Sequence, residues 1–485
     1  MKYLSILDHH GKRIPVKASG YQGGASGRRM GAWTPSSAGP SSVVTNTLSS
    51  LRSRSRDLIR NNPLADGGVD DYVATVIGTG LKPRWYKLDT KEREIMQDHW
   101  RDWCEEADVY GRLSFYGLQS IVVRGLVDAG ESLIRIIRST VKSTDKFPLK
   151  LQVLEADHLD EKYSVAVGDT KIRMGIEIND YGIPEFYHLW REHPGEPFLG
   201  RNLERMRVPA DDLMHVFKVL RAGQLRGRPG FSSVIVKLYD LDQYDDAELV
   251  RKKGAAMFGG FLYEEEKSDQ YPDPSEFLGR KDGTDDEGQD IIAFEPGTFP
   301  RLPKGLKVEF SKPADVGSMY EGWMKKQLRD IAKGFGLTYD MFTGDLSNVN
   351  FSSIRVGLNA LKRRVTQFQQ EVVIFQMNRR VMKEFLRAMV LTGRLGIREY
   401  ERNARKYSDV LWTPDRWPSA NPYQDAQMDL LEVQAGFASR SKKVMERGED
   451  VEKVDREQQE DLARERETGV NYSSTVAQGG GVSDE

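Results

Sequence analysis

The stretch GDLSNVNFSS (Gly344–Ser353), followed by IRVGLNALKRRVTQFQQEVVIFQMNRRVMKEFLRAMVLTG (Ile354–Gly393), decides how this chain is interpreted. After Ile354 the apolar residues recur at intervals of three and four, which predicts one face of a single long helix. Ser352 or Ser353 can cap its start and Gly393 can end it. At 1.5 Å per residue, roughly 39 residues form a rod about 58 Å long. The apolar positions are Leu358, Leu361, Val365, Phe368, Val372, Phe375, Met382, Leu386 and Met389.

A rod of this length has two interpretations. Its apolar seam can lie in the core of a large monomer, or it can pack partly against another chain. The sequence alone leaves both open.

Composition narrows the function classes. The chain has 485 residues, enough for two or three domains, and a formal charge of −2. Proteins that grip nucleic acid through phosphates carry an excess of Lys and Arg, so tight DNA binding is not predicted, although DNA could still pass a nearly neutral surface. The single cysteine, Cys104, allows no intrachain disulfide and fits a reducing compartment. No apolar run of about 18 residues predicts a membrane span.

The first half of the chain predicts an α+β domain, because helical spacing gives way to alternation after Gly130. Arg52, Arg54 and Arg56 in the first helix could contact phosphate or pair with carboxylates. The expected helices cover 45–63, 70–77, 91–106 and 115–128. In the last of these, Leu118, Ile121, Val122 and Leu126 are predicted to be buried. The expected half-buried strands lie near 133–137, 149–153, 172–178, 184–190 and 214–219.

The second half predicts two helices that enclose a small β insertion. The first, 233–258, carries a drifting apolar stripe (Leu238, Leu241, Tyr244, Ala247 and Val250) and many carboxylates. The insertion has a solvated loop at Gly279–Asp290 and strands at 291–294 and 306–310. The second helix, 316–335, turns Met319, Trp323, Leu328, Ile331 and Phe335 inward. After Gly393 we expect a shorter helix, a Trp/Pro-rich connector (411–422), a helix over 422–438 and a highly polar tail.

The most specific enzyme motifs are absent: the sequence has no GxxxxGK[ST], GxSxG or HExxH. No catalytic residue, metal site or cofactor is therefore predicted. One acidic segment, LEADHLDE (Leu154–Glu161), could hold a divalent metal for phosphodiester hydrolysis, but it fits a strand end followed by an acidic turn equally well. Its candidate ligands are Glu155, Asp157, His158, Asp160 and Glu161.

Several segments, in one order, resemble the lambda-type portal proteins (head–tail connectors) of tailed bacteriophages over about residues 20–400. They are GRRMGAWTPSSAGPSS (27–42), LRSRSRDLIRNNPLADGGVDDYVATVIGTGLKPR (51–84), LQVLEADHLD (151–160), HVFKVLRAGQLRGRPGFSSVI (215–235), LDQYDDAELVRKKGAA (241–256) and FTGDLSNVNFSSIR (342–355).

The resemblance implies a portal fold that divides this chain into nine segments. They are an extended N-terminal arm (1–44), an α/β wing (45–232), stem helix 1 (233–258), a small β-containing clip (259–315), stem helix 2 (316–343), a tunnel loop (344–353), the long helix and return to the wing (354–410), a helical crown (411–450) and a flexible C-terminal tail (451–485).

It also implies a structural protein of the virion without enzymatic activity. About twelve copies would form a ring at one capsid vertex, assembled in the host cytoplasm, through which double-stranded DNA passes without sequence specificity during packaging and ejection. Implied partners are the large terminase subunit, then the head–tail adaptor, and the major capsid and scaffolding proteins; no membrane is implied.

Three groups of residues are predicted to act in such a ring. The tunnel loop would contact DNA weakly through Asp345, Ser347, Asn348 and Asn350, because a strongly basic bore would hold the duplex. The stem would line the bore with Asp240, Asp242, Asp245, Asp246, Glu248, Lys325 and Lys326. The contact between subunits would include Arg52, Arg54, Arg56, Arg363 and Arg364.

Two alternatives remain open at this point. One is another ring-forming connector or adaptor of the virion. The other is a metal-dependent nuclease centred on Glu155–Glu161.

Overall fold

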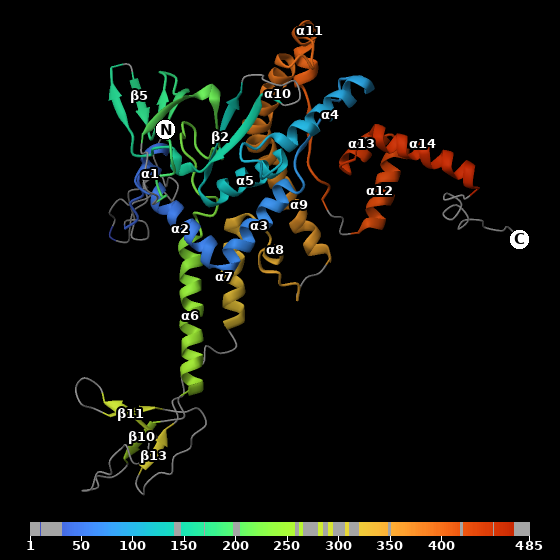
Figure 1. Cartoon of the computed structure of the whole chain (residues 1–485). Helices are drawn as coiled ribbons and strands as arrows, with labels where there is room; N and C mark the ends of the chain where they lie inside the picture. Colours follow the sequence, from blue (N-terminus) through green and yellow to red (C-terminus); the bar gives the residue numbers. More distant parts are fainter. Residues whose placement is uncertain are drawn as a thin grey trace, which may run out of the picture.

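The structure is a computed structural model of residues 1–485. It describes residue 10 and residues 32–139, 147–168, 170–196, 204–257, 261–264, 280–284, 290–293, 306–309, 320–347, 351–417, 421–449 and 451–469. Within these, residues 254–257, 261–264, 280–284, 290–293, 306–309 and 351–353 are described by their backbone alone. Figure 1 shows a mixed helix and sheet body, two helices that project from it, a small β module at their far end, and C-terminal helices on the side.

The helices of the predicted wing lie near the expected positions, and the sequence explains several of their ends. Asn62 caps the third helix by accepting from the backbone N–H groups of Leu64 and Ala65, and Pro63 occupies its first turn. That helix therefore begins at Pro63, seven residues before the expected start. The helices are α1 (Pro40–Thr45), α2 (Leu48–Asn61), α3 (Pro63–Ile77), α4 (Thr90–Glu106) and α5 (Phe115–Asp128).

Two antiparallel sheets complete the wing. The three-stranded sheet has the order β3-β2-β9, with β2 (Glu131–Arg138) between β3 (Leu149–Leu154) and β9 (Leu213–Phe217). The prediction that this central strand is half-buried is wrong: Ile134 and Ile136, on the face expected to be polar, are also buried. Helix α5 and the long helix both contact this sheet, which accounts for the burial.

The five-stranded sheet is a simple meander, β4-β5-β6-β7-β8. The single strand expected over 172–178 is instead a hairpin, because Met174 and Gly175 both take positive φ angles, 51° and 80°. The strands are β4 (Val165–Val167), β5 (Thr170–Arg173), β6 (Ile176–Ile178), β7 (Pro184–Trp190) and β8 (Arg205–Pro209).

The long helix is continuous but not uniform. It consists of α9 (Phe351–Phe368), a π-helical segment (Gln369–Asn378, η5) and α10 (Arg379–Leu391). A π-helix has a wider turn, so the π segment rotates the seam. Phe375, a predicted seam residue, is 60% exposed, while Ile374 and Met377 are buried in its place. The expected cap at Ser352 or Ser353 is wrong because α9 begins at Phe351, whereas Gly393 ends the rod with φ +71° as predicted.

The seam of the long helix belongs to the chain's own core. From Leu361 onward its buried residues pack with the aromatic side chains of α4 and α5, including Trp100, Trp103 and Phe115. Ring centroids of Trp100 and Phe385 lie 5.0 Å apart. Of the two interpretations of the rod, the core of a monomer is therefore the correct one for this seam.

The projecting pair consists of α6 (Ile235–Met257) and α7 (Tyr320–Phe335), with a small β module beyond their far ends (Figure 1). Part of the expected loop Gly279–Asp290 is in fact strand β11 (Arg280–Thr284), which pairs with β12 (Asp290–Ala293). A second pair joins β10 (Phe261–Glu264) to β13 (Leu306–Glu309). Helix α7 stops before Gly336, at φ +85°, and α8 (Tyr339–Thr343) follows, so predicted stem helix 2 is two helices. Met319 lies outside the described residues.

The C-terminal region differs most from the expected boundaries. Residues Leu411–Thr413, at the start of the segment expected to form the crown, are strand β14, which pairs with β1 (Lys82–Arg84) in the segment expected to form the wing. The flexible tail expected from residue 451 is wrong for α14 (Val451–Thr468), because Glu452 pairs with Arg84 at 3.2 Å and also with Arg93. The other helices are α11 (Ile397–Ser408), α12 (Pro422–Gln434) and α13 (Arg440–Glu446). Among the described helices, none is long and apolar enough to span a membrane.

Candidate functional site

The projecting helices α6 and α7 are held together by aromatic, ionic and close backbone contacts. The ring of Tyr244 lies 5.0 Å from that of Trp323, and Lys237 pairs with Asp330. Gly334 allows the helices to approach, because a Cβ there would lie 2.4 Å from a methyl carbon of Val234. Trp323, predicted to turn inward, is 43% exposed despite its contact with Tyr244.

The carboxylates of α6 do not form one uniform wall. Asp242 accepts a hydrogen bond from the Asn62 side chain at 2.8 Å, and Asp245 accepts one from the Tyr320 hydroxyl at 3.1 Å. Glu248 pairs with Arg251 at 2.6 Å, and the hydrogen bond from Arg251 lowers the Glu248 pKa. Asp240 and Asp246 are exposed and, in the described part of the chain, have neither a hydrogen bond nor an ion pair. Among the residues that the structure describes, these two are the carboxylates of α6 without a partner.

The cations predicted for the stem are also paired locally. Lys325 contacts Glu321 at 2.6 Å, and Lys326 contacts Asp330 at 3.5 Å, both one helical turn away on α7. The hydrogen bond to Glu321 raises the pKa of Lys325. Such exposed pairs contribute little to stability, so these side chains remain available to other partners.

The start of the predicted tunnel loop is locally ordered around Asp345. Its carboxylate accepts hydrogen bonds from the Ser347 hydroxyl at 2.5 Å, from the Ser347 backbone N–H at 3.0 Å and from the Tyr339 hydroxyl at 2.9 Å. These hydrogen bonds, the one from the Ser347 hydroxyl first, lower the Asp345 pKa to about 2. Gly344 precedes it with φ +70°. Asn348 and Asn350 lie outside the described residues.

Two of the arginines assigned to the subunit contact are engaged inside the chain. Arg52 is only 2% exposed, and it pairs with Glu161 at 2.9 Å and with Glu131 at 3.4 Å. Arg56 contacts Asp157 at 2.7 Å and Glu155 at 2.9 Å. The placement of Arg52 at a subunit surface is therefore wrong for this chain, because its guanidinium is buried and neutralised within the wing.

The remaining interface candidates are on the surface. Arg54 is exposed on α2, and Arg363 and Arg364 are exposed on α9. Their role in a contact between subunits stays a prediction.

The centre of this charge cluster is Glu131, which the sequence analysis did not identify. Its carboxylate receives the Arg226 Nε–H at 2.8 Å, the Gly227 backbone N–H at 2.8 Å and a contact from His215 Nε2 at 3.0 Å. Burial would raise its pKa, but the charge of Arg226 and then the contacts from His215 and Arg52 outweigh burial and lower it. The only sequence signal was a glutamate at the start of strand β2.

Three of the candidate nuclease ligands each contact a different partner and do not form one site. Asp160 contacts Arg205 at 3.1 Å, Glu161 contacts Arg52, and Nδ1 of His158 lies 3.1 Å from the Trp190 carbonyl. Glu155 and Asp157 do lie together with His193, with ligand atoms within 4.8 Å, a set that could hold a cation.

That set already has a cation. The guanidinium of Arg56 contacts both of its carboxylates, and it lowers the Asp157 pKa against the opposing effect of burial. A metal would have to displace Arg56 from this position, so the arrangement fits an ion-pair cluster better than a metal site.

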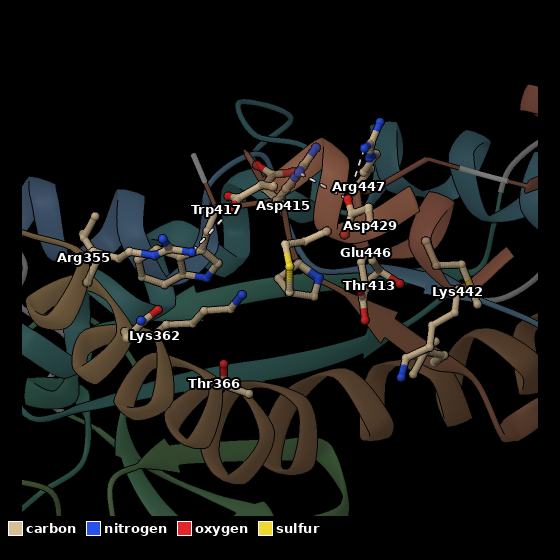
Figure 2. A pocket seen from close by; sticks show the side chains of 18 of the residues that line it. Arg355, Lys362, Thr366, Thr413, Asp415, Trp417, Asp429, Lys442, Glu446 and Arg447 are labelled. Atoms are coloured by element: carbon tan, nitrogen blue, oxygen red, sulfur yellow. Dashed lines mark hydrogen bonds and ion pairs between the residues drawn. The ribbon is translucent and has the colours of Figure 1, made fainter. Parts of the chain in front are cut away.

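A cleft of about 730 Å³ lies between α9 and the C-terminal helices. Figure 2 shows Arg355, Lys362 and Thr366 on the α9 side, facing the connector and the residues of α12 and α13. Across its rim Arg355 contacts Asp425 at 3.6 Å. Its lining is mixed in charge and has no nucleophile–base arrangement among the residues described.

Ion pairs connect the C-terminal helices α12 and α13. Asp429 of α12 receives Lys443 at 3.0 Å and Arg447 at 3.1 Å, and Arg416 lies 3.9 Å away. Burial opposes these contacts, but the pKa of Asp429 is still lowered. Helix α12 has no buried residue, so ionic contacts rather than apolar packing hold it here.

Comparison with known protein families places the chain in a known class. A family model described as "Phage portal protein, lambda family" matches residues 26–369, well over half of the chain. The chain therefore belongs to the lambda family of phage portal proteins, a structural family. The resemblance identified from the sequence is confirmed.

Individual relatives agree with this membership. The "Probable portal protein" of Halomonas phage phiHAP-1 is 27% identical over 433 residues, covering 88% of this chain and 80% of that protein. The "Portal protein" of Escherichia phage N15 is 22% identical over 521 residues, covering 98% and 96%. Among solved structures, a chain of the "Neck of empty GTA particle computed with C6 symmetry" aligns with 15% identity, 87% and 97% coverage, and a TM-score of 0.47.

Proposed function

We propose that this protein is the portal of a tailed phage: identical copies form a ring at one vertex of the capsid, and double-stranded DNA passes through its centre during packaging and ejection. Membership of the lambda portal family across residues 26–369 is the observation that carries this proposal. The projecting pair α6 and α7, with a small β module at its tip, supports it, because such a pair can line a bore when many copies stand around one axis (Figure 1).

The parts of the chain have distinct roles in this proposal. The pair α6 and α7 forms the stem, residues 259–315 form the clip, and the loop at Gly344–Ser353 forms the narrowest part of the bore. The helices after residue 422 form a crown on the capsid side. The clip receives the large terminase subunit and later the head–tail adaptor, while the wing contacts the major capsid and scaffolding proteins. The ring is assembled in the host cytoplasm.

The physical requirement on the bore is that DNA slides without being held. Duplex DNA carries one charge per roughly 1.7 Å of axis, so a row of unpaired Lys or Arg would bind it by releasing counterions. Several stem charges are paired with opposite charges nearby, as the contacts of Lys325, Lys326 and Glu248 illustrate. Paired charges present a weak net field to phosphate, which suits passage rather than binding.

The ring is tested by the mass of the purified protein. Twelve copies of a 55.1 kDa chain give 12 × 55.1, about 661 kDa. Mass photometry should detect one dominant closed species near this value; a chain that stays at 55.1 kDa at every concentration would overturn the proposal.

Bulky substitutions in the loop test whether it forms the narrowest part of the bore. Asn348→Trp together with Asn350→Trp should narrow the bore and shorten or prevent packaging while rings still form. Asn403→Trp, which places the same side chain at an exposed asparagine of α11, serves as the control. Normal genome length in the loop variant would exclude the loop from the narrowest part of the bore.

A further inference from the structure

A separate cavity of about 420 Å³ lies where the projecting pair meets the body of the chain (Figure 1). Its lining comes from α3, α5, the end of α7, the long helix and the segment 218–231. This volume falls in the range of about 300–1,000 Å³ that is typical of ligand pockets. None of the portal roles proposed above involves this cavity.

The walls of the cavity are apolar and packed inside the chain. The rings of Phe231 and Phe335 stack with their centroids 4.5 Å apart, and the rings of Tyr72 and Phe368 meet edge to face at 5.9 Å. Buried aliphatic side chains complete the walls: Leu126, Val127, Leu361, Val365 and Val372. Because these groups are already held by their neighbours, a molecule that enters meets a preformed surface and loses little free energy in ordering it.

The lip of the cavity is apolar and uncovered. Val219 and Leu220 line it and are 56% and 48% exposed. Their loop is fixed by side-chain amides: Gln376 donates to the Phe217 carbonyl at 2.9 Å, and Gln224 accepts from the Leu220 backbone N–H at 2.8 Å. Two apolar side chains held in water at the edge of an apolar cavity indicate a surface that another molecule covers.

Cations surround the mouth of the cavity. Lys218, Lys333 and Arg364 line it and are exposed, and within the described part of the chain none of the three has an ion pair or a hydrogen bond. Arg228 adds a fourth cation to the lining. Among the lining residues that the structure describes, Glu371 is the one carboxylate. Four cations against one carboxylate give the mouth a positive field that attracts acidic groups.

One of these cations lies directly beside an apolar wall. A Cβ placed at Gly336 would be 3.7 Å from a ring carbon of Tyr72 and 4.0 Å from a guanidinium nitrogen of Arg364. Burial raises the pKa of Tyr72 to about 12, and the charge of Arg364 opposes that rise. A molecule with an apolar group inside the cavity therefore brings its neighbouring atoms within reach of this guanidinium.

We propose that this cavity binds an acidic segment of a partner protein, with one aromatic or large aliphatic side chain inside it and carboxylates on both sides paired with the cations at the mouth. The apolar walls favour the central side chain, and the unpaired cations favour its acidic neighbours. Duplex DNA is also negative, but its bases are stacked inside the helix and would leave the walls empty. The inference goes beyond the portal function and does not depend on it, because the cavity is formed within one chain.

Fluorescence anisotropy tests the site on the full-length protein. The probe is a fluorescein-labelled peptide of a phenylalanine with two glutamates on each side, and it should bind saturably. A peptide with alanine at the centre, or with lysines in place of the glutamates, should bind at least about tenfold more weakly.

Variants of the mouth locate the binding. Arg364→Glu should weaken binding of the probe at least about tenfold, because it places a carboxylate beside those of the peptide. Arg363→Glu is the matched control, since it makes the same change at the preceding residue of α9, which is exposed and does not line the cavity. Leu220→Gln, which changes no charge, should weaken binding about threefold or more, because it removes part of the apolar lip. Far-ultraviolet circular dichroism confirms that each variant is folded.

The outcomes separate this inference from the proposed function. If the probe does not bind, or if Arg364→Glu and Arg363→Glu weaken it equally, the site is wrong and the portal function stands. If single copies bind the probe and rings do not, a second copy occupies the cavity instead of a partner protein. If duplex DNA displaces the probe from the native chain, the ligand is DNA and the inference fails. A chain that binds the probe as expected but forms no ring would keep the site and refute the portal.

Discussion

Replacing Arg226 with methionine should strongly destabilise the part of the chain that contains the Glu131 cluster. Its guanidinium is fully buried, and it holds Glu131 through Nε at 2.8 and 3.1 Å while also donating to the Met174 carbonyl at 2.9 Å. Arg226→Met leaves the buried, negatively charged carboxylate of Glu131 without the cation that contributes most to neutralising it. Breaking a buried pair in this way costs about 3–5 kcal/mol, a large fraction of a typical domain stability of about 5–15 kcal/mol.

The assay is urea unfolding followed by tryptophan fluorescence, which the buried side chains of Trp85, Trp100, Trp103 and Trp412 make sensitive to loss of the core. With a slope of about 3 kcal/mol/M, the midpoint should fall by about 1 M or more. Arg101→Met is the matched control, because its pair with Asp98 at 2.8 Å is exposed and should cost at most about 1 kcal/mol.

The double variant Glu131→Gln with Arg226→Met should recover part of the loss, because the uncompensated charge is gone. If Arg226→Met shifts the midpoint no more than Arg101→Met, the buried cluster does not hold the wing together as argued.

Three further predictions follow from other sites. Gly334→Ala should cost about 1–3 kcal/mol because the new methyl meets Val234, whereas Gly322→Ala, with no atom within 4 Å, should gain up to about 1 kcal/mol; urea midpoints compare the two. Burial, opposed by Arg56, raises the pKa of Asp128 from 3.8 to about 7. Between these two values the native state holds a proton that the unfolded chain releases, so the free energy of unfolding should fall as pH rises from about 4 to 7. In denaturant titrations Asp128→Asn should remove that slope and gain up to about 4 kcal/mol at pH 8. Glu452→Ala should free α14 from Arg84 and Arg93, and limited proteolysis should then cleave Val451–Thr468 sooner than in the native chain, while unchanged cleavage would show that other contacts hold the helix.

Elements whose residues act locally could be predicted from the sequence. The bounds of α5 and β7 were predicted correctly, and a capping serine at 114 marks the start of α5. The drift of the α6 stripe was also visible: Leu238 and Leu241 are buried, whereas Val250 near the far end is exposed. Ile121 shows the limit of such spacing, since it was expected inside α5 and is 45% exposed.

Features that depend on distant partners could not be predicted. Glu131 and Arg226 are 95 positions apart, and nothing in either local sequence indicates that they meet. The π segment that turns Phe375 outward contacts strand β9, and the spacing of the apolar residues in the long helix does not indicate it. Arg52 looked like a surface residue of an amphipathic helix because its buried carboxylate partners come from elsewhere in the chain.

The central claim is that many copies of this chain enclose an open bore, and direct imaging of the purified protein tests it. Electron microscopy of negatively stained particles should show closed rings viewed along their axis, each with a central hole wide enough for duplex DNA. Single copies, open chains of copies, or closed rings too narrow for duplex DNA would contradict the account.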